Sequence, residues 1–477
     1  MGIYKTPGVY VEELSSFPPS VADVATAVPV FIGFTENGEV NKPVRISSML
    51  EYETKFGFGN KPSKIMKGDI TNNYVMYDSI RMFYDNGGGV CWIYPIGIYN
   101  ESLTDVANKF GKAVERMDEM DEVTLILFPD ATMMLDKNEL ASLQVKALSK
   151  AAELQDKFVI LDVKDDDVQG FRNTLSADSE VLRYGAAYYP MLRSVYKKSF
   201  SIAEILEYDK NDILWKDNEI IKFYKNILSD TKALDKAPSK EKEPVKKDVV
   251  EFFKQISNEY RQKIDSLILR LSWYKDVINE MNSKACMLPP SGAIAGVISR
   301  IDSSRGVWAS PANAGINSVV DLTVTVTDAA QERLNVDTDA GKSINAIRWF
   351  SGKGIMVWGA RTLDGNSNEW RYVSVRRLFN YVEESVKKST AWAVFQPNDA
   401  NTWVKMKSQI ENFLNNLWRE GALAGASPAQ AFFVKVGMPE TMTAQDILEG
   451  RVIVKIGMAA VRPAEFIVLQ FSHMMQK

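Results

Sequence analysis

The chain has 477 residues, enough for two or three domains, and its 45% hydrophobic and 25% charged content is ordinary for a soluble globular protein. Its 57 basic and 61 acidic side chains give a formal net charge of −4, which does not indicate a nucleic-acid-binding protein. No apolar run approaches the ~18 residues of a membrane-spanning helix, and the first residues lack the charged-then-apolar pattern of a signal peptide.

The histidine and cysteine content restricts the chemistry further. The one histidine, His473, lies close to the C-terminal end, whereas Ser-His-Asp, Cys-His and histidine-rich metal sites need an imidazole in the core. Cys91 and Cys286 lie far apart in sequence and form neither a metal-binding pattern nor a disulfide framework, which favours a reducing compartment. We therefore predict no catalytic residue, no metal site and no cofactor.

Residues 1–25 predict an extended arm. The segment TPGVYVEEL (residues 6–14) has a Pro-Gly turn followed by the alternation of a β-strand, and an FPP sequence then interrupts the chain, so no hairpin partner follows. A lone strand has to pair with a distant strand of its own subunit or with another chain. The residues of this strand are Val9, Tyr10, Val11 and Glu12.

Residues 26–343 predict an α/β domain. An apolar strand at 28–38 is followed, at 77–96, by a helix, a glycine stop and a second strand. The glycines at 87–89 follow a helix and precede a strand, the reverse of the order in nucleotide-binding loops, so we interpret them as a helix stop. Two further helix–strand units, ending in strands at 123–131 and 158–163, predict parallel pairing with right-handed crossovers.

Asp130 and Asp162 are the best candidates for catalysis, because they lie at the carboxyl ends of these two strands, where α/β enzymes often place functional groups. Without a histidine, cysteine or ligand spacing beside them, turn-forming aspartates are the simpler interpretation. An α/β hydrolase-like enzyme therefore stays as the less favoured alternative. A GKS sequence at 341–343 matches the back half of a phosphate-binding loop but lacks its first glycine, and we reject that function.

Residues 193–285 are helical and charged, and we interpret them as an insertion into the α/β domain. A polar, proline-containing break at 237–247 predicts two helices that fold back on each other, although a coiled-coil dimer is an alternative. After the insertion, the alternating sequence DLTVTVTD (residues 321–328) predicts a strand.

Residues 354–386 predict a buried strand followed by an amphipathic helix. Arg376 and Arg377 lie together near the start of this helix, where the helix dipole disfavours cations. They are either a solvated or salt-bridged pair or the target of an acidic partner segment. Further on, 391–398 predicts a strand and a turn, 403–423 a helix with Val404 inward, and 466–471 a final lone strand.

Several of these segments resemble contractile tail sheath proteins, which occur in contractile phages, R-type pyocins and bacterial contractile injection systems. The similar stretches are TPGVYVEE at the start, PPSG, AGV, the run from Asp302 to Trp308 and SPAN in the middle, GARTL with WRYVSVRRL, and PAEFIVLQ at the end. The resemblance covers roughly four fifths of the chain by the extent of these segments and is interrupted mainly by the insertion. Met191 departs from the family pattern, in which a tryptophan is usual.

The resemblance implies an α/β (α+β) multidomain subunit: an N-terminal arm (1–25), an outer domain (26–343) with the helical insertion, an inner core domain (344–460) and a C-terminal strand arm (461–477). The C-terminal arm would contain Phe466, Ile467, Val468 and Leu469. The structural motif residues would be Pro289, Pro290, Ser291, Gly292, Gly359, Arg361, Thr362, Arg376 and Arg377. The helix at 403–423, with Lys405 and Lys407, is the candidate element facing an inner tube.

The function that the resemblance implies is structural. Copies of the chain would form stacked hexameric rings around a tube, interlock through the arms, and contract to drive the tube through a target envelope. The implied partners are the chain itself, the tube protein, and baseplate and terminal cap proteins, with no nucleic acid and no membrane insertion. Assembly would take place in the bacterial cytoplasm, in a phage tail or a related particle. The residues alone leave open a static shell protein and an arrangement in which both arms pair within their own subunit.

Overall fold

The computed structural model describes residues 21–466, apart from 61, 63, 67–68, 100–103, 202–203, 206–207, 209–271 and 338–340. The predicted strand at Val9, Tyr10, Val11 and Glu12, the residues Ile467, Val468 and Leu469, His473 and most of the insertion lie outside the described residues. The mixed α/β class that the sequence predicted is confirmed.

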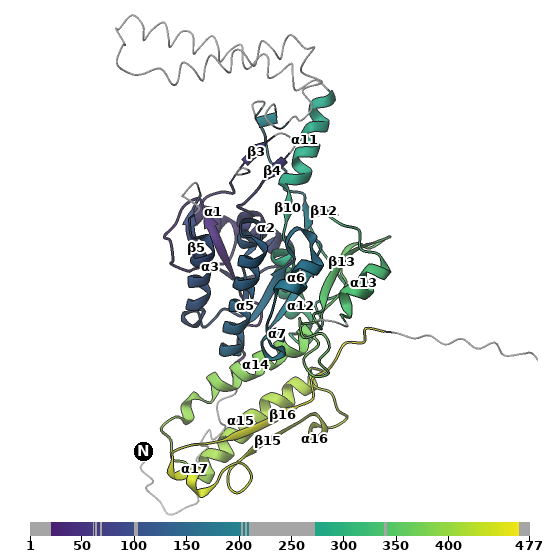
Figure 1. The fold of residues 1–477 in the computed structure, drawn as a ribbon. Coiled ribbons are helices and arrows are strands. Elements are labelled where there is room, and N and C mark those ends of the chain that lie inside the picture. The colour runs from purple at the N-terminus through teal and green to yellow at the C-terminus, as the bar shows by residue number, and fades with distance from the viewer. Residues whose placement is uncertain are drawn as a thin grey trace, which may run out of the picture.

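A nine-stranded sheet forms the centre of the molecule, in the order β11-β14-β13-β8-β7-β6-β1-β5-β2 (Figure 1). The six strands from β13 to β5 pair in parallel, and the pairs at both edges are antiparallel. Every residue of β1, β6, β7 and β8 is buried, as parallel strands covered on both faces require. The strands are β1 (Pro29–Thr35), β2 (Val44–Ile46), β5 (Cys91–Ile98), β6 (Leu125–Leu127), β7 (Phe158–Asp162), β8 (Gly185–Tyr189), β11 (Ala314–Gly315), β13 (Ile344–Phe350) and β14 (Gly354–Val357).

Helices cover both faces of this sheet and divide its core into two clusters. One cluster contains side chains of α3 (Val106–Glu115), α5 (Lys137–Leu154) and the shorter helices; the other contains side chains of α1 (Met49–Phe56), α2 (Met76–Asp85) and α12 (Ser291–Arg305). The shorter helices are α4 (Pro129–Met134), α6 (Val168–Thr174), α7 (Ser179–Leu182) and α13 (Asp328–Asn335), with 3-10 turns at η1 (Arg116–Glu119) and η2 (Lys164–Asp166). The glycine stop predicted after α2 is confirmed, because Gly87 has φ +97° directly after the helix end.

A second unit lies below the sheet in Figure 1 and has its own core. It contains α14 (Val373–Ser389), α15 (Ala400–Arg419), and the antiparallel ribbon of β15 (Phe432–Val436) and β16 (Val454–Met458). Short elements complete it: η4 (Ala391–Ala393), α16 (Pro428–Ala431) and α17 (Ala444–Leu448). Helix α14 joins the two units, because Val373 packs in the sheet core whereas Leu378 and Val382 pack in the second core.

The insertion begins and ends at the opposite end of the sheet domain. There α11 (Ser272–Ala285) packs with the hairpin of β3 (Lys64–Met66) and β4 (Asp69–Thr71) in a small core that includes Ile70 and Met281 (Figure 1). The adjoining three-stranded sheet contains β9 (Leu192–Ser194), β10 (Met287–Leu288) and β12 (Val319–Leu322).

Several predicted elements differ in the structure. The strand predicted at 321–328 ends at Leu322, because the Thr327 side chain accepts a hydrogen bond from Ala330 N and caps α13. The strand predicted at 391–398 is instead the short turn η4 and a loop in which Phe395 has φ +64° and is fully exposed. Val404, predicted to face inward, is exposed, and Met406 takes the buried position on α15. The predicted boundary between residues 343 and 344 falls within the main sheet, because β13 pairs with β8.

Candidate functional site: anchors of the two chain ends

The strand order β5-β1-β6-β7-β8 places Asp130 at the point where sheets of this topology usually bind ligands, between the carboxyl ends of β1 and β6. In this structure the Asp130 carboxylate occupies that position and binds backbone N–H groups there. Its Oδ1 accepts hydrogen bonds from Val75 N and Met76 N, both at 2.7 Å, and its Oδ2 accepts one from Phe34 N at 2.8 Å. Complete burial raises the pKa of Asp130 to about 7. The side chain is therefore engaged in joining three backbone segments.

Asp162 has a corresponding role at the end of β7. Its Oδ1 accepts a hydrogen bond from Ser291 N at 2.8 Å, and its Oδ2 accepts one from Ser291 Oγ at 2.6 Å, at the first residue of α12. Burial raises the pKa of Asp162 to about 7 as well. The prediction that these aspartates form local turns is wrong, since each joins segments that are distant in sequence. Among the described residues, no cluster of His, Cys, Asp and Glu could hold a metal ion.

The PPSG motif brings α12 against the sheet and against α2. Pro289 and Pro290 are buried, Pro290 directly precedes the helix, and Ser291 binds Asp162. A Cβ at Gly292 would lie 2.5 Å from the backbone oxygen of Ser79 on α2. Only glycine permits this approach of two helix backbones.

The GKS sequence has a structural role. Lys342 is buried, and its Nζ donates to the carbonyl oxygen of Arg172 at 2.7 Å. Ser343 Oγ donates to the carbonyl oxygen of Asn335 at 2.6 Å. Neither side chain is available to a phosphate, in agreement with the rejection of that motif.

Arg377 holds the residues that follow the N-terminal arm. Its guanidinium forms two hydrogen bonds with the Asp302 carboxylate on α12, at 2.9 and 2.5 Å, and donates a third to the carbonyl oxygen of Thr26 at 2.8 Å. Arg377 and Asp302 have 3% and 5% of their side-chain surface exposed. The acidic partner of this arginine therefore comes from the same chain, and the ion pair is buried.

Arg376 is held mainly by aromatic rings. Its guanidinium lies 4.3 Å from the ring centre of Trp370 and 4.8 Å from that of Tyr184, and its Nε donates to Asn380 Oδ1 at 2.7 Å. Its Nη2 lies 3.3 Å from the Glu383 carboxylate. Burial lowers the pKa of Arg376. These contacts pack the start of α14 against the sheet domain. Of the interpretation as a solvated or salt-bridged pair, burial rules out the solvated form, whereas both arginines do form ion pairs, Arg377 with Asp302 and Arg376 with Glu383.

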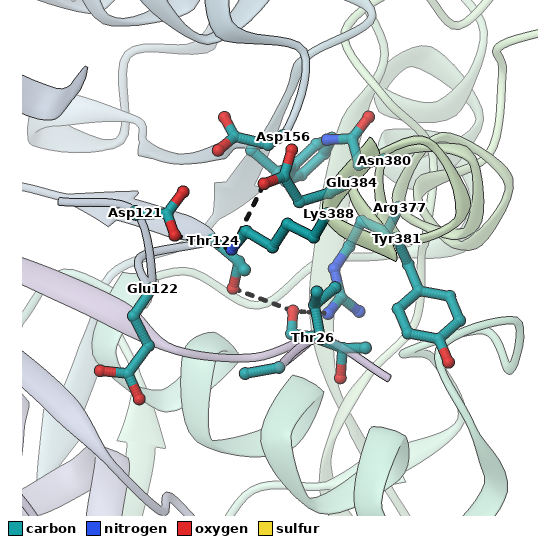
Figure 2. Close-up of a pocket in the computed structure, with 13 residues that line it drawn as sticks. Thr26, Asp121, Glu122, Thr124, Asp156, Arg377, Asn380, Tyr381, Glu384 and Lys388 are labelled. Carbon is teal, nitrogen blue, oxygen red and sulfur yellow. Dashed lines mark hydrogen bonds and ion pairs between the residues drawn. The ribbon is translucent and has the colours of Figure 1, made fainter. Parts of the chain in front are cut away.

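We call residues 22–28 the N-terminal root. Besides Thr26, this segment is held by Tyr381, whose hydroxyl donates to Asp23 Oδ1 at 2.7 Å, and by Thr124, whose Oγ1 accepts from Val28 N at 2.9 Å. A cavity of about 340 Å³ lies alongside, between α14 and the sheet domain. Figure 2 shows Thr26 between Thr124 and Arg377, with its carbonyl oxygen directed at both.

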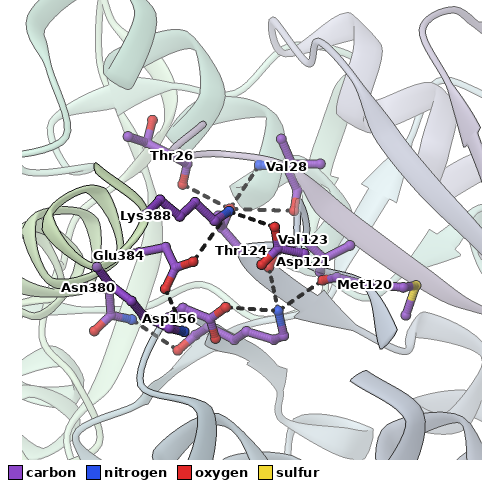
Figure 3. A network of polar contacts seen from close by, with 12 residues as sticks. Thr26, Val28, Met120, Asp121, Val123, Thr124, Asp156, Asn380, Glu384 and Lys388 are labelled. Carbon is purple, nitrogen blue, oxygen red and sulfur yellow. Dashed lines mark hydrogen bonds and ion pairs between the residues drawn. The ribbon is translucent and has the colours of Figure 1, made fainter. Parts of the chain in front are cut away.

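Polar contacts at the same junction hold α14 to the sheet domain. Lys157, 1% exposed, donates to the carbonyl oxygens of Met120 and Val123, and its own carbonyl oxygen accepts from Asn380 Nδ2 at 3.1 Å. Lys388 Nζ lies 2.8 Å from Asp121 Oδ2 (Figure 3). The N-terminal root thus crosses a junction at which direct contacts already hold the two units together.

We call residues 463–466 the C-terminal root, and Arg361 holds it. The guanidinium is 4% exposed, forms two hydrogen bonds with the Glu465 carboxylate, one of them at 2.8 Å, and donates to the carbonyl oxygen of Asn335 at 3.1 Å. Phe466, the last described residue, is 74% exposed and borders a groove of about 580 Å³.

The other residues of the GART motif support Arg361. Asn345 Oδ1 accepts a hydrogen bond from Arg361 N at 2.7 Å, and a Cβ at Gly359 would lie 2.8 Å from that same oxygen. Thr362 Oγ1 donates to the carbonyl oxygen of Trp370 at 2.8 Å.

The predicted site residues therefore separate into groups. Arg361 and Arg377 lie at the two roots, whereas Lys405 is exposed and Lys407 is half-buried on α15, with Lys407 Nζ 3.9 Å from Glu411. Sequence reasoning missed the partners Asp302 and Glu465. Both lie inside segments that resemble the family, so an acidic residue within a motif was the available signal.

Comparisons with known proteins agree on one family. Residues 236–363 match the model of the phage tail sheath protein central domain, and residues 366–473 match the model of the phage tail sheath C-terminal domain. The tail sheath protein of Vibrio phage KVP40 is 26% identical over 144 residues, which are 30% of this chain and 21% of that protein. The chain thus spans about a fifth of the length of this curated relative.

Two solved structures match almost the whole chain. A chain in the six-fold symmetrised baseplate of the anti-feeding prophage is 29% identical, with a TM-score of 0.63, and the match covers 99% of this chain and 100% of that one. A chain of the contracted helical sheath of the anti-feeding prophage is also 29% identical, with a TM-score of 0.64, covering 98% and 99% of the two chains.

Proposed function

Because this chain belongs to the contractile tail sheath family, we propose that it is the structural subunit of the sheath of a contractile injection machine. Copies of the chain form stacked hexameric rings around an inner tube, and the sheath shortens to drive the tube through a target envelope. The subunits assemble in an extended state of higher free energy and relax to a state with better interfaces, so the gains of many subunits add up. The mechanism involves no chemical step.

The observation that carries this proposal is that each end of the described chain is held by a buried arginine. Arg377 holds the N-terminal root and Arg361 holds the C-terminal root. An arm that leaves from a fixed position starts in a defined direction, which lowers the conformational entropy lost when a neighbouring subunit binds it. This arrangement favours arms that pair between subunits over arms that fold back on their own subunit.

The ribbon of β15 and β16 is the best acceptor for such arms. Within the described residues, neither strand has a partner strand along its outer edge, and α15 packs beside β15. A two-stranded ribbon is only marginally stable alone, and its open edges offer backbone N–H and C=O groups to added strands. Phe433 on β15 is 53% exposed and would be covered by a neighbour.

The two units correspond to the inner and outer domains of the proposed sheath. The unit of α14 to α17 would face the tube, with Lys405 and Lys407 as candidate contacts, and the sheet domain with its insertion would lie outside. The further partners are the tube protein and the baseplate and cap proteins at the two ends. Within the described residues, no helix is both long and apolar enough to cross a membrane.

The test is negative-stain microscopy of the untagged full-length chain beside a variant that lacks residues 1–14. We expect the full-length chain to form hollow, helically striated cylinders and the truncated chain to remain as discrete particles. Circular dichroism and thermal unfolding serve as the control, because the truncated chain should keep the fold of the wild type. Normal contractile sheaths from the truncated chain would contradict the proposal. If the full-length chain forms cylinders whose length per ring is the same with and without the tube protein, that result would favour a static shell.

A further inference from the structure

The two arginines that hold the roots are joined to each other by a short path. Residues 359–362 lie antiparallel to residues 370–373: Thr362 N donates to the carbonyl oxygen of Arg371 at 2.8 Å, and Val373 N donates to that of Ala360 at 3.0 Å. An isolated β-bridge pairs Arg361 with Tyr372 between these two hydrogen bonds. Helix α14 begins at Val373, and Arg377 follows one turn later.

The path consists of buried ion pairs and regular backbone structure. Arg361 and Arg377 are both almost completely buried, and each forms two hydrogen bonds with a carboxylate. Such charge-assisted, two-point contacts are stronger and more directional than single neutral hydrogen bonds. The antiparallel pairing and the helix turn between them are regular, hydrogen-bonded backbone structure.

A second connection between the roots runs through the core of the second unit, against which Val21 and Ala460 both pack. The N-terminal root leads directly into β1 in the centre of the sheet, whereas the C-terminal root follows β16 of the second unit. Neither root pairs with the other as a strand among the described residues. The route through residues 359–377 differs from that second connection in consisting of buried ion pairs and backbone hydrogen bonds.

We propose that residues 359–362 and 370–381 form a tension link, which joins the two arms of one subunit so that they act as a single mechanical element. This inference rests on the proposed function, in which neighbouring subunits hold the arms. A pull on the C-terminal arm passes from Glu465 to Arg361, across the β-bridge to α14, and through Arg377 and Tyr381 to the N-terminal root. The arms of successive subunits are then connected in series, and the sheath domains carry little of the load during contraction.

The experiment uses two single substitutions in the full-length chain, one at each root. Glu465→Gln keeps the shape of the side chain and removes the charge that binds Arg361, and Tyr381→Phe removes the hydroxyl that binds Asp23. Both single variants, the double variant and an exposed control on α3, Lys112→Gln, are compared with the wild type. The concentration at which sheaths form is measured by sedimentation and confirmed by negative-stain microscopy, and the unfolding midpoint of each unassembled chain is measured by circular dichroism.

If the two root contacts act in series, the effects of the two substitutions on the assembly concentration should not add. We expect each single variant to raise the assembly concentration roughly 3- to 10-fold and the double variant to raise it no more than the larger single effect, because either break already interrupts the link. The control should assemble as the wild type. Glu465→Gln should lower the unfolding midpoint by several degrees, because it leaves the buried Arg361 without its carboxylate. Tyr381→Phe should leave the midpoint nearly unchanged, so its loss of assembly separates the link from general destabilisation.

Three outcomes would overturn the tension link. Single-variant effects that multiply in the double variant would show that the roots act independently. Assembly losses that follow the unfolding midpoints would indicate general destabilisation. Wild-type assembly of all variants would show that the contacts carry no load. These outcomes differ from failure of the proposed function itself, which would appear as normal sheaths from the chain lacking residues 1–14.

Discussion

Replacing Asp130 by asparagine tests whether the crevice at the end of β6 is a structural joint or a site for chemistry. The carboxylate accepts three backbone hydrogen bonds, two on Oδ1 and one on Oδ2. An asparagine of the same shape has one carbonyl oxygen. In its better orientation it still accepts from Val75 N and Met76 N, but its NH₂ group then faces Phe34 N–H, and a buried donor is left without an acceptor.

The expected cost follows from that count. One unsatisfied buried N–H costs about 1–3 kcal/mol, and the opposite orientation would leave two. The side chain cannot move away, because it lies against Gly33, where an added Cβ would be 2.5 Å from Asp130 Oδ2. We therefore expect Asp130→Asn to lower the free energy of unfolding by about 1–3 kcal/mol at pH 7, whereas Asp118→Asn, at an exposed position, should change it by less than about 0.5 kcal/mol.

The pH dependence gives the same prediction a second test. Since burial raises the pKa of Asp130 to about 7, the folded chain binds this proton more tightly than the unfolded chain, where the pKa is about 3.9. The stability that this group contributes is therefore complete below pH 4 and is lost as the pH rises to 7, by about 1.4 kcal/mol per pH unit within that window. Asp162 titrates in the same way in the wild type and in the Asp130→Asn variant, so its contribution cancels in the stability difference between them. The stability difference between wild type and Asp130→Asn should accordingly shrink from pH 4 to pH 7.

The assay is urea unfolding of the unassembled chain, followed by circular dichroism between pH 4 and pH 8. An Asp130→Asn variant that is as stable as the wild type from pH 4 to pH 7 would refute the reasoning. The carboxylate would then be free of a structural role, and the enzyme interpretation would regain its best candidate residue.

Three further substitutions or reagents test other contacts. Gly292→Ala should lower the free energy of unfolding by about 1–3 kcal/mol, because its Cβ would meet the Ser79 backbone, whereas Gly315→Ala, with open space around it, should be nearly neutral in the same urea titration. Asp302→Asn leaves Arg377 buried without its carboxylate and should lower the free energy of unfolding by about 3–5 kcal/mol. Its control, Glu411→Gln, removes an exposed partner of Lys407 and should lower it by less than about 1 kcal/mol. Equal costs would contradict the importance of burial. Cys91 and Cys286 are buried free thiols, and burial raises the pKa of Cys91 to about 12. Neither thiol should therefore react with a thiol reagent at pH 8 until the chain unfolds. Rapid labelling of the folded chain would instead show an open route to the core.

The segments with strong local patterns could be predicted from the sequence. The apolar runs around residues 28–38 and 158–163 became β1 and β7, and the glycine stop after α2 lies where the pattern placed it. Local patterns failed where a tertiary or capping contact outweighed them. The alternating residues at 321–328 are not one strand, because Thr327 caps α13, and the apolar residues at 391–398 are a turn with Phe395 on the surface. Both errors arise because alternation and apolarity indicate burial only when a neighbouring element is present to provide it.

The candidate site depended on contacts between residues that are far apart in the chain. The sequence by itself determined the family, through short motifs such as PPSG and GART, and the absence of a well-placed histidine that argued against an enzyme. It could not show that Arg377 meets Asp302 and Thr26, or that Arg361 meets Glu465, because these pairs are separated by 75, 351 and 104 positions. Only the tertiary structure decided that these arginines are buried at the two roots, since burial of a charge depends on which elements surround it and not on its neighbours in sequence.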